Sequence, residues 1–256
     1  MMNVLERFFS ELSAKKKCLF LLDYDGTLAP LLADRSQAFP YEGVKERLQD
    51  LSDYKNYRMV IISGRSLEDL ERFLKSIDPR LELWGSHGLE HLNQSGQRKC
   101  EPIDPSIQEG LQKALEACLL YCPSQRCEIK PFGIAFHWRG IDEKAREKIK
   151  QVILPDWEKI TQAYPLHIYQ FDGGLELKPR DRNKGDVVKE LLQNTPSDVP
   201  VVYMGDDQTD EDAFKVLGER GLKVLVRKEF RPTLADVHLV PPEELLTFFD
   251  RCKSMA

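Results

Sequence analysis

Residues 18–28 read Cys-Leu-Phe-Leu-Leu-Asp-Tyr-Asp-Gly-Thr-Leu. An apolar run behind the lysines of Lys15–Lys17 is typical of a buried strand in a parallel sheet, whose two faces are both covered. The run ends in Asp23 and Asp25, and open α/β sheets bind ligands at the carboxyl ends of their strands. Two carboxylates that lose hydration together repel each other, so we expect a cation or a chemical task there. The alternative is an ordinary Asp-Gly turn after a strand.

The composition indicates a globular chain with a proper core. Of its 256 residues 41% are hydrophobic and 31% are charged, and the formal net charge is -5. This acidic balance argues against binding to nucleic acid, which needs a basic face. The apolar run between Lys17 and Asp23 is too short for a signal peptide, and no run reaches the length of a membrane span. We therefore expect a cytoplasmic protein without a membrane partner.

The cysteines favour the same compartment. They form no Cys-x-x-Cys pair, so buried and reduced thiols are favoured over a disulfide framework. The absence of a Cys/His ligand spacing also argues against zinc. The spacing of Cys118 and Cys122 is that of packing neighbours on a helix. The full set is Cys18, Cys100, Cys118, Cys122, Cys127 and Cys252.

Strands alternate with helices at both ends of the chain, which predicts βαβ units and a parallel sheet. Besides the strand at 18–22, the expected strands are 58–62, 81–84, 199–204, 223–226 and 237–240. The expected helices are 4–13, 67–75 and 210–217.

The middle of the chain behaves differently. Helical patterns cover 107–121 and 142–153, and strand patterns cover 127–130, 133–138, 167–171 and 175–178. The last two strands are joined by Asp172-Gly173-Gly174, a hairpin signal. The sequence therefore predicts a Rossmann-like α/β core at residues 1–87 and 181–256, interrupted by an inserted α+β domain at 88–180.

Four short segments fall at the ends of the expected core elements. They are Asp23–Thr27, Ser63–Arg65, Asn183–Gly185 and Gly205–Asp212. Each alone is a weak signal, because Ser-Gly-Arg turns are common, a lone lysine is usually solvated, and an acidic run can cap a helix. A helix cap explains residues 210–212, but it does not explain why Asp206 and Asp207 directly follow a buried strand.

Together the segments supply the parts of a phosphoryl-transfer site. One carboxylate can be the nucleophile and form an aspartyl phosphate, and a second can protonate the leaving oxygen and then activate water. Hydroxyls and backbone N–H groups after a strand can hold phosphate oxygens, and a lysine can offset their charge. Clustered hard oxygen ligands suit Mg²⁺.

In their order the segments resemble the four motifs of the haloacid dehalogenase superfamily of phosphatases, and the insertion before Lys184 resembles that superfamily's larger α/β cap domain. The resemblance implies that the catalytic residues are Asp23 as nucleophile, Asp25 as general acid/base, and Lys184. It implies that phosphate is bound by Thr27, Ser63, Gly64 and Lys184. It implies the cofactor Mg²⁺, bound by Asp23, the backbone carbonyl of Asp25, and Asp206, with Asp207 and Asp210 as less direct contributors.

Within the superfamily the chain is most similar to the trehalose-6-phosphate phosphatase family. The resemblance runs from one end of the chain to the other, in the strings at 23–30, 63–65, 85–90, 136–139, 175–179, 183–185 and 205–214. Two departures are mild: Ser86-His87-Gly88 stands where the family usually has Glu-His-Gly, and Trp138 stands where Tyr is common. They concern substrate preference and not the reaction.

Candidate sugar-binding side chains alternate along two strands of the expected insertion. Glu176 and Lys178 share one strand face, and so do His137 and Arg139. A carboxylate and an ammonium aimed together can bind several hydroxyls, whereas the alternative is a solvent-facing cross-strand ion pair. The family resemblance favours the functional interpretation.

The resemblance also implies substrate-binding roles for Arg65 and His87, the latter near the hinge of the insertion. His91 is expected to be structural, and His167 and His238 have no evident role.

The implied activity is magnesium-dependent hydrolysis of trehalose 6-phosphate to trehalose and phosphate through an aspartyl phosphate, the last step of trehalose biosynthesis. A partnership with a trehalose-6-phosphate synthase is a further expectation. The alternatives are a phosphatase for another sugar phosphate or sugar-phosphoglycerate, a mutase, and a non-catalytic sugar-phosphate sensor. The presence of every motif residue speaks against the sensor.

Overall fold

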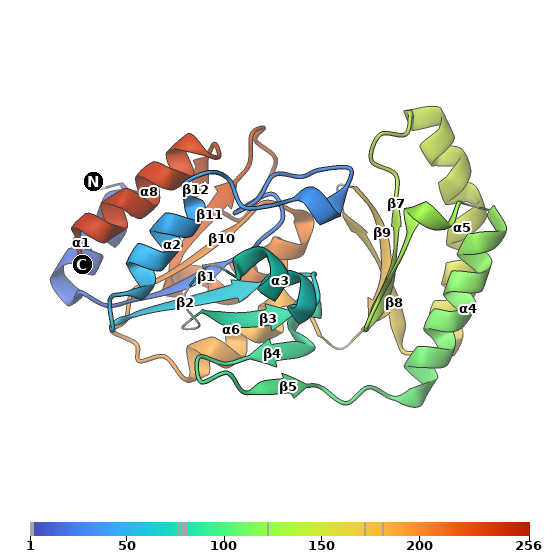
Figure 1. The fold of residues 1–256 in the computed structure, drawn as a ribbon, viewed down its shortest axis with the longest axis horizontal. Helices are drawn as coiled ribbons and strands as arrows, with labels where there is room; N and C mark the ends of the chain where they lie inside the picture. The colour runs from blue at the N-terminus through green and yellow to red at the C-terminus, as the bar shows by residue number, and fades with distance from the viewer. Residues whose placement is uncertain (1–2, 76, 78–80, 122, 172, 181) are drawn as a thin grey trace. The chain divides into compact units, whose positions relative to one another are not determined.

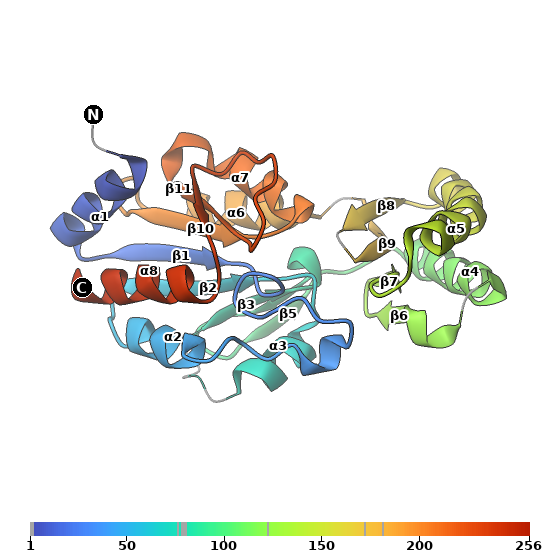
Figure 2. The ribbon, with the colours of Figure 1, turned by 90° about the horizontal axis from the view of Figure 1, so that it is seen from above.

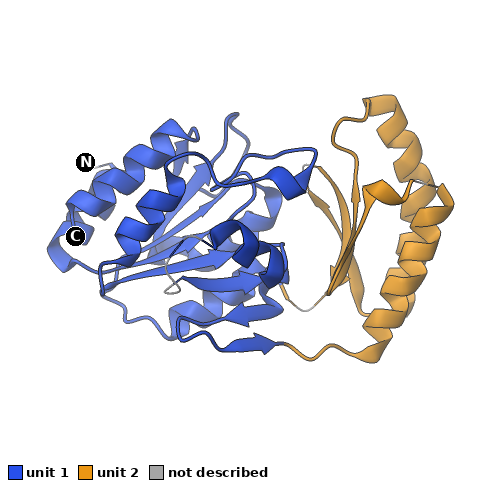
Figure 3. Ribbon diagram, in the orientation of Figure 1, with its two compact units in different colours: residues 1–100, 183–256 blue, residues 101–182 orange. Residues whose placement is uncertain are grey.

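We describe the protein from a computed structural model, at residues 3–75, 77, 81–121, 123–171, 173–180 and 182–256. The chain forms two compact units, Met1–Cys100 with Asn183–Ala256, and Glu101–Arg182 (Figure 3). The second unit is therefore inserted into the first. It begins after Cys100, later than the predicted position 88, because residues 90–100 add two strands to the sheet of the first unit. No helix in the described part of the chain is long and apolar enough to cross a membrane.

The first unit is built on an eight-stranded sheet with the order β12-β11-β10-β1-β2-β3-β4-β5 (Figure 1). The neighbours from β12 to β3 pair in parallel, which confirms the predicted α/β fold, and β4 and β5 are antiparallel at one edge. The strands are β1 Cys18–Leu22, β2 Tyr57–Ile62, β3 Glu82–Gly85, β4 Glu90–Leu92, β5 Arg98–Cys100, β10 Val201–Gly205, β11 Leu222–Val226 and β12 Val237–Leu239.

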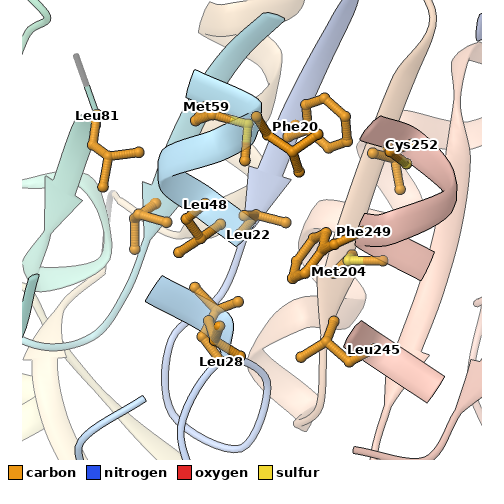
Figure 4. Close-up of a cluster of buried hydrophobic side chains, with 14 of the residues drawn as sticks. Phe20, Leu22, Leu28, Leu48, Met59, Leu81, Met204, Leu245, Phe249 and Cys252 are labelled. Carbon is orange, nitrogen blue, oxygen red and sulfur yellow. The ribbon is translucent and has the colours of Figure 1, made fainter. Parts of the chain in front are cut away.

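Strand β1 is buried on both faces, because successive side chains of a strand point to opposite sides. Phe20 and Leu22 join one apolar cluster, to which Met204 of β10 also belongs (Figure 4). Leu19 and Leu21 join a second cluster on the other face. The apolar run that opened the sequence analysis is thus the central strand of the core.

Helices cover both faces of this sheet. Figure 2 shows α6 and α7 on one side and α2 and α3 on the other. Helix α8 supplies Phe248 and Phe249 to the cluster of α2 and α3, and Phe8 of α1 stacks on Phe248 with ring centroids 5.9 Å apart. The helices are α1 Val4–Lys15, α2 Val44–Ser52, α3 Leu67–Leu74, α6 Lys184–Gln193, α7 Glu211–Leu217 and α8 Glu243–Ser254.

The second unit is a four-stranded antiparallel sheet with the order β6-β7-β9-β8. Its apolar residues, among them Leu175 and Leu177, pack with Trp157 of α5 and Ala114 of α4, and the indole N–H of Trp157 donates to the carbonyl of Ala114 at 3.1 Å. The elements are α4 Pro105–Tyr121, β6 Cys127–Lys130, β7 Gly133–His137, α5 Glu143–Ala163, β8 Leu166–Phe171 and β9 Gly174–Pro179. Two positions used in the sequence analysis, Cys122 and Asp172, lie outside the described residues.

Besides α6, of which only the starting residues Asn183–Gly185 were placed, the sequence analysis missed two helices and two strands and cut one helix short. Helices α2 and α8 were missed because neither begins with a side-chain N-cap bond, and strands β4 and β5 were missed because they are short and half-exposed or exposed. Helix α5 was expected to end at Ile153, before Pro155, but it continues to Ala163. Buried Trp157 and Ile160 lie beyond the proline, so packing outweighs the hydrogen bond that proline removes.

Candidate active site

Asp23 lies directly at the carboxyl end of the central strand β1. Its backbone N–H donates to the carbonyl of Met204 in β10 at 2.9 Å, so the residues that follow these two parallel strands are brought side by side. The carboxylate is buried, with 3% of the residue exposed. Lys184 Nζ lies 2.6 Å from Asp23 Oδ1, and Thr27 Oγ1 donates to Asp23 Oδ2 at 3.3 Å.

Lys184 is delivered by the start of α6. Asn183 Oδ1 accepts from the backbone N–H of Gly185 at 2.7 Å, and Asp186 Oδ2 accepts from the N–H of Asn183 at 3.0 Å. This reciprocal cap fixes the first helical turn, as capping boxes do. Lys184 is therefore held as a buried cation and is not the solvated lysine that its sequence alone allowed.

Asp210 organises the acidic loop after β10. Its Oδ1 accepts from Lys184 Nζ and from the hydroxyl of Tyr203, each at 2.7 Å. Its Oδ2 accepts from the backbone N–H groups of Asp206 and Asp207 at 3.1 and 3.0 Å. Because both oxygens are occupied in this way, Asp210 is placed to orient the loop. The sequence analysis missed Tyr203, which reads as one more apolar position of a buried strand.

Asp206 carries the atom that most clearly lacks a partner. Its Oδ2 is buried, and no group among the described residues forms a hydrogen bond with it. Oxygens of Asp23, Asp206 and Asp210 all lie within 4.8 Å of one another, against the single ammonium of Lys184. Buried polar atoms without partners are rare, so this arrangement fits a hard divalent cation bound between the carboxylates.

The electrostatics of the cluster point the same way. Burial raises the pKa of Asp23 to about 7, and the charge of Asp210 adds to this while Lys184 opposes it. Burial, together with the charges of Asp23 and Asp210, also raises the pKa of Asp206 well above its ordinary value. For Lys184 the two aspartates outweigh burial and keep its pKa above the ordinary value. A bound cation would relieve the repulsion and favour both carboxylates in their ionised form.

Gly26 makes room for the Asp206 carboxylate. Its φ of +84° is a left-handed conformation that side chains disfavour, and an added Cβ would stand 2.0 Å from Asp206 Oδ2. The glycine of the opening motif is therefore required both by the turn and by the packing of a site residue.

Asp25 is held by an arginine fork. Arg65 Nε and Nη2 donate to its two carboxylate oxygens at 2.8 and 2.7 Å, and Arg65 Nη2 also donates to the carbonyl of Arg35 at 3.0 Å. Arg65 is buried, and its guanidinium stacks 4.7 Å from the ring centroid of Phe73. The structure thus places Arg65, expected to bind substrate, in direct contact with the proposed acid/base.

The turn after β2 meets His87. Ser63 Oγ accepts from the backbone N–H of Arg65 at 3.1 Å, and the Ser63 carbonyl accepts from the N–H of His87 at 2.9 Å. A Cβ on Gly64 would lie 2.6 Å from His87 Nε2, so the imidazole packs against the backbone of Gly64. Ser86 and His87 both adopt positive φ values, 49° and 56°. Such strain in residues other than glycine is common at functional sites.

In the second unit the predicted sugar-binding residues have neighbours that the sequence analysis did not name. Lys130 Nζ of β6 lies 2.7 Å from Glu176 Oε1 of β9. The intervening strand β7 has a glycine here, Gly133, whose missing side chain leaves room for this contact. Lys178 Nζ lies 4.1 Å from the ring centroid of Tyr169. The same two-residue alternation that pointed to Glu176 and Lys178 could have pointed to Lys130.

The remaining predicted residues are placed as follows. His137 Nε2 lies 2.7 Å from Glu128 Oε2, and the carbonyl of Arg139 accepts from Arg126 at 3.3 Å. Asp207 Oδ1 accepts from the N–H of Gln208 at 2.7 Å, which makes it the cap of a short 3-10 turn.

The other histidines have structural contacts. His91 stacks on Trp84 with centroids 3.8 Å apart, and its Nε2 lies 2.9 Å from Glu82 Oε1, in keeping with the structural role expected for it. His238 Nε2 lies 2.7 Å from the carbonyl of Arg227, and His167 meets the edge of Tyr169.

A parallel α/β core whose central strand ends in Asp23, with Lys184 and an acidic loop around it, defines a phosphatase of the haloacid dehalogenase superfamily. The family model for trehalose-phosphatases matches residues 21–238. The chain belongs to that family and is an enzyme of it.

Relatives of known name support this assignment. The chain is 32% identical over 260 residues to probable trehalose-phosphate phosphatase 4 of Oryza sativa subsp. japonica, covering 95% of this chain and 68% of that protein. It is 31% identical over 255 residues to trehalose-phosphate phosphatase B of Arabidopsis thaliana, covering 92% of this chain and 66% of that protein. The chain thus spans about two thirds of the length of these plant relatives.

Solved structures show the same fold. The C-terminal domain of a C. albicans trehalose-6-phosphate phosphatase aligns with a TM-score of 0.86 at 22% identity, covering 98% of this chain and 97% of that one. A haloacid dehalogenase-like hydrolase from B. subtilis aligns with a TM-score of 0.64 at 14% identity, covering 91% and 98%. The C-terminal domain of a Candida albicans trehalose synthase regulatory protein aligns with a TM-score of 0.72 at 15% identity, covering 96% and 98%.

Proposed function

We propose that the chain hydrolyses trehalose 6-phosphate to trehalose and phosphate, with Mg²⁺ and through an aspartyl phosphate on Asp23. The observation that carries this proposal is the buried Asp23 carboxylate, which contacts Lys184 and has an oxygen within 4.8 Å of an oxygen of Asp206. Asp206 also has a buried oxygen without a hydrogen-bond partner among the described residues. The named activities of the plant relatives supply the substrate.

In the first step a carboxylate oxygen of Asp23 attacks phosphorus, and the bond from phosphorus to the sugar oxygen breaks. Protonated Asp25 donates its proton to that leaving oxygen. In the second step Asp25 takes a proton from water, the water oxygen attacks phosphorus, and the bond to Asp23 breaks, which regenerates both side chains.

The other core residues prepare these steps. The Lys184 ammonium and the Thr27 hydroxyl already contact Asp23, so they are placed to bind the phosphoryl oxygens as charge develops. Ser63 and the N–H of Gly64 would bind the same group from the turn after β2. The fork of Arg65 holds the ionised Asp25 carboxylate in one rotamer, the form that takes a proton from water in the second step.

The residues that would hold Mg²⁺ are Asp23, Asp206 and the backbone carbonyl of Asp25. When bound, the ion offsets the charge of the carboxylates and of the phosphoryl group.

We further propose that residues 101–182 form the cap domain that gives specificity for the sugar. Glu176, Lys178, His137 and Arg139 would bind hydroxyls, and His87 of the first unit would contact substrate near the hinge. The ion pair between Glu176 and Lys130 supports this, because it fixes the carboxylate in one rotamer.

The deciding experiment measures phosphate release from a panel of sugar phosphates, with Mg²⁺, with chelator, and with Mg²⁺ restored. Trehalose 6-phosphate should have the highest kcat/KM, and chelation should abolish turnover reversibly. A higher kcat/KM for a sugar-phosphoglycerate would replace the substrate assignment. Binding without phosphate release would indicate a sensor, and transfer of phosphate to a second sugar would indicate a mutase.

The implied partnership with a trehalose-6-phosphate synthase is a separate proposal. Its only structural support is the fold shared with a regulatory-protein domain. The test is to mix the chain with a purified synthase, separate the mixture by size-exclusion chromatography, and measure the mass of each peak by light scattering. Two proteins that elute separately, each with its own mass, would contradict the partnership.

A further inference from the structure

The segment that follows β11 contains an arginine that neither the motifs nor the proposed chemistry uses. Arg231 Nε donates to the carbonyl of Asp206 at 3.0 Å, and Arg231 Nη2 donates to the carbonyl of Asp207 at 2.7 Å. Its Nη1 donates to Glu211 Oε1 at 2.5 Å and to the carbonyl of Pro232 at 2.9 Å. Only 16% of this side chain is exposed. One guanidinium thus contacts two successive peptide groups of the acidic loop.

Glu211 holds the arginine segment at a second point. It is the first residue of α7, and its Oε1 accepts from the hydroxyl of Thr233 at 2.7 Å. Its Oε2 accepts from the backbone N–H of Leu234 at 2.9 Å. The segment 231–234 and the acidic loop are therefore joined by several hydrogen bonds with charged partners, which are the stronger kind.

The peptide groups at 206 and 207 are consequently fixed from two directions. Their N–H groups donate to Asp210 Oδ2, and their carbonyls accept from Arg231. The Asp206 carboxylate itself has an oxygen that forms no hydrogen bond with any described residue. Its direction therefore depends on the backbone on which it sits. That backbone is held by Asp210 and Arg231, and Arg227 Nη1 adds a longer contact to the carbonyl of Asp206 at 3.5 Å.

We propose that Arg231 is a positioning residue for the divalent cation: it aims the Asp206 carboxylate by holding the carbonyls of residues 206 and 207. The inference rests on the magnesium site proposed above. Arginine is required because its planar fork reaches both carbonyls at once, whereas a lysine ammonium is a single point of charge. Residues that orient metal ligands commonly change metal affinity by about 10–100-fold when they are replaced.

The test is a calorimetric titration of Mg²⁺ into the wild-type chain, Arg231→Lys, and the control Arg220→Lys. Arg220 also donates to a backbone carbonyl, that of Pro196 at 2.8 Å, but this bond is exposed to solvent and plays no part in the site. Arg231→Lys should weaken Mg²⁺ binding about 10-fold or more, and the control should match the wild type. Half-maximal activity should require correspondingly more Mg²⁺, while kcat at saturating Mg²⁺ and KM for substrate stay close to wild type. A further variant, Arg231→Ala, should also bind Mg²⁺ more weakly than the wild type, and the addition of millimolar guanidinium should restore its Mg²⁺ affinity.

The outcomes separate this inference from the proposed function. If the wild type binds no Mg²⁺, the proposed metal site is wrong, and the proposed positioning role of Arg231 is wrong as well. If the wild type binds Mg²⁺ and Arg231→Lys binds it equally well, the positioning role alone is overturned, even where thermal denaturation shows a lower Tm. Should Arg231→Lys not fold, Glu211→Gln replaces it. Losing one charged partner of Arg231 should weaken Mg²⁺ binding about twofold or more, because only part of the energy of that charge-assisted bond is transmitted to the metal site. Unchanged affinity would overturn the inference.

Discussion

The two units place their polar side chains on their sheets in opposite ways. In the first unit the central parallel strands β1 and β10 are buried along their whole length and carry no charged residue, and charged groups such as Asp23 and Asp206 stand beyond the ends of these strands. In the second unit the helices pack with one face of an antiparallel sheet, and charged groups such as Glu176 and Lys178 alternate along the other. The first arrangement fixes functional atoms through the backbone, and the second through cross-strand neighbours.

This difference predicts that the two units act on different parts of the substrate. The first unit should act on any phosphate ester, because its groups concentrate on the phosphoryl centre. The second should act only on substrates that carry a sugar. The predictions below test that division with trehalose 6-phosphate and a small aryl phosphate measured side by side.

Asp23→Asn should have the largest effect and should reduce turnover of both substrates to background. The amide keeps the size of the side chain but removes the nucleophilic anion. Circular dichroism and phosphate release measure folding and activity. The matched control is Asp34→Asn, which changes an exposed aspartate that caps a surface turn, and it should keep full activity. Substantial turnover by folded Asp23→Asn would mean that another group attacks phosphorus.

Gly26→Ala should abolish Mg²⁺ binding, and with it activity on both substrates. Its Cβ would stand 2.0 Å from Asp206 Oδ2, so the carboxylate must move. Gly43→Ala is the control, because Gly43 has the same φ of +84° but its Cβ would meet the movable end of Arg47. Calorimetry should show Mg²⁺ binding in the control alone. Equal affinities in both variants would show that the Asp206 position does not matter.

Asp25→Asn should distinguish the two substrates in the first chemical step. A sugar alkoxide needs a proton to leave, whereas an aryl oxide needs little help, and general acid catalysis is worth about 10²–10⁴-fold. Rapid-quench measurement of single turnovers should therefore show a large loss for the sugar phosphate and a smaller loss for the aryl phosphate. Equal losses on the two substrates would argue against Asp25 as the acid that protonates the leaving oxygen.

Glu176→Ala should lower kcat/KM for trehalose 6-phosphate by about 10–150-fold, which corresponds to about 1.5–3 kcal/mol for a hydrogen bond to a charged group. The aryl phosphate should lose almost nothing. Lys184→Ala provides the contrast, since it contacts Asp23 and should impair both substrates alike. An equal loss on both substrates with Glu176→Ala would remove the division between the units.

Asp206→Asn should stabilise the metal-free chain at neutral pH, the smallest of these effects. Burial and neighbouring charge raise the pKa of Asp206 in the folded state, so folding there favours the protonated form. Stability without metal should therefore fall as pH rises above about 4, the value in the unfolded chain, and the neighbouring Asp23 should add to this fall up to pH about 7. The substitution removes the Asp206 part of that loss and should raise Tm at pH 8 by about 2–4 °C for each kcal/mol recovered.

Differential scanning calorimetry from pH 5 to 8, without and with Mg²⁺, measures this effect. Mg²⁺ should raise the Tm of the wild type and leave that of Asp206→Asn almost unchanged. A Tm for Asp206→Asn below that of the metal-free wild type at pH 8 would contradict the assumed repulsion.

The α/β class and the order of most core elements could be predicted from the amino-acid sequence. This was possible because an apolar run that ends in charge, as at Cys18–Leu22, has few other stable environments. The sequence also nominated Asp23, Lys184 and Asp206, since these follow elements whose ends must meet at one edge of a parallel sheet. Patterns of this kind can be recognised in a single sequence because each depends only on residues that are close together in the chain.

The contacts between individual side chains could not be predicted in this way and were revealed by the folded structure. In the folded chain Lys184 contacts Asp23, which is far from it in sequence, and Arg65 donates hydrogen bonds to Asp25. Arg231 donates a hydrogen bond to a backbone carbonyl of the acidic loop. These contacts join residues far apart in sequence. An arginine in a loop belongs to no periodic pattern, so its partner cannot be predicted from the residues around it. The positions of such side chains follow from packing and from satisfying buried polar groups, and both are properties of the folded chain as a whole.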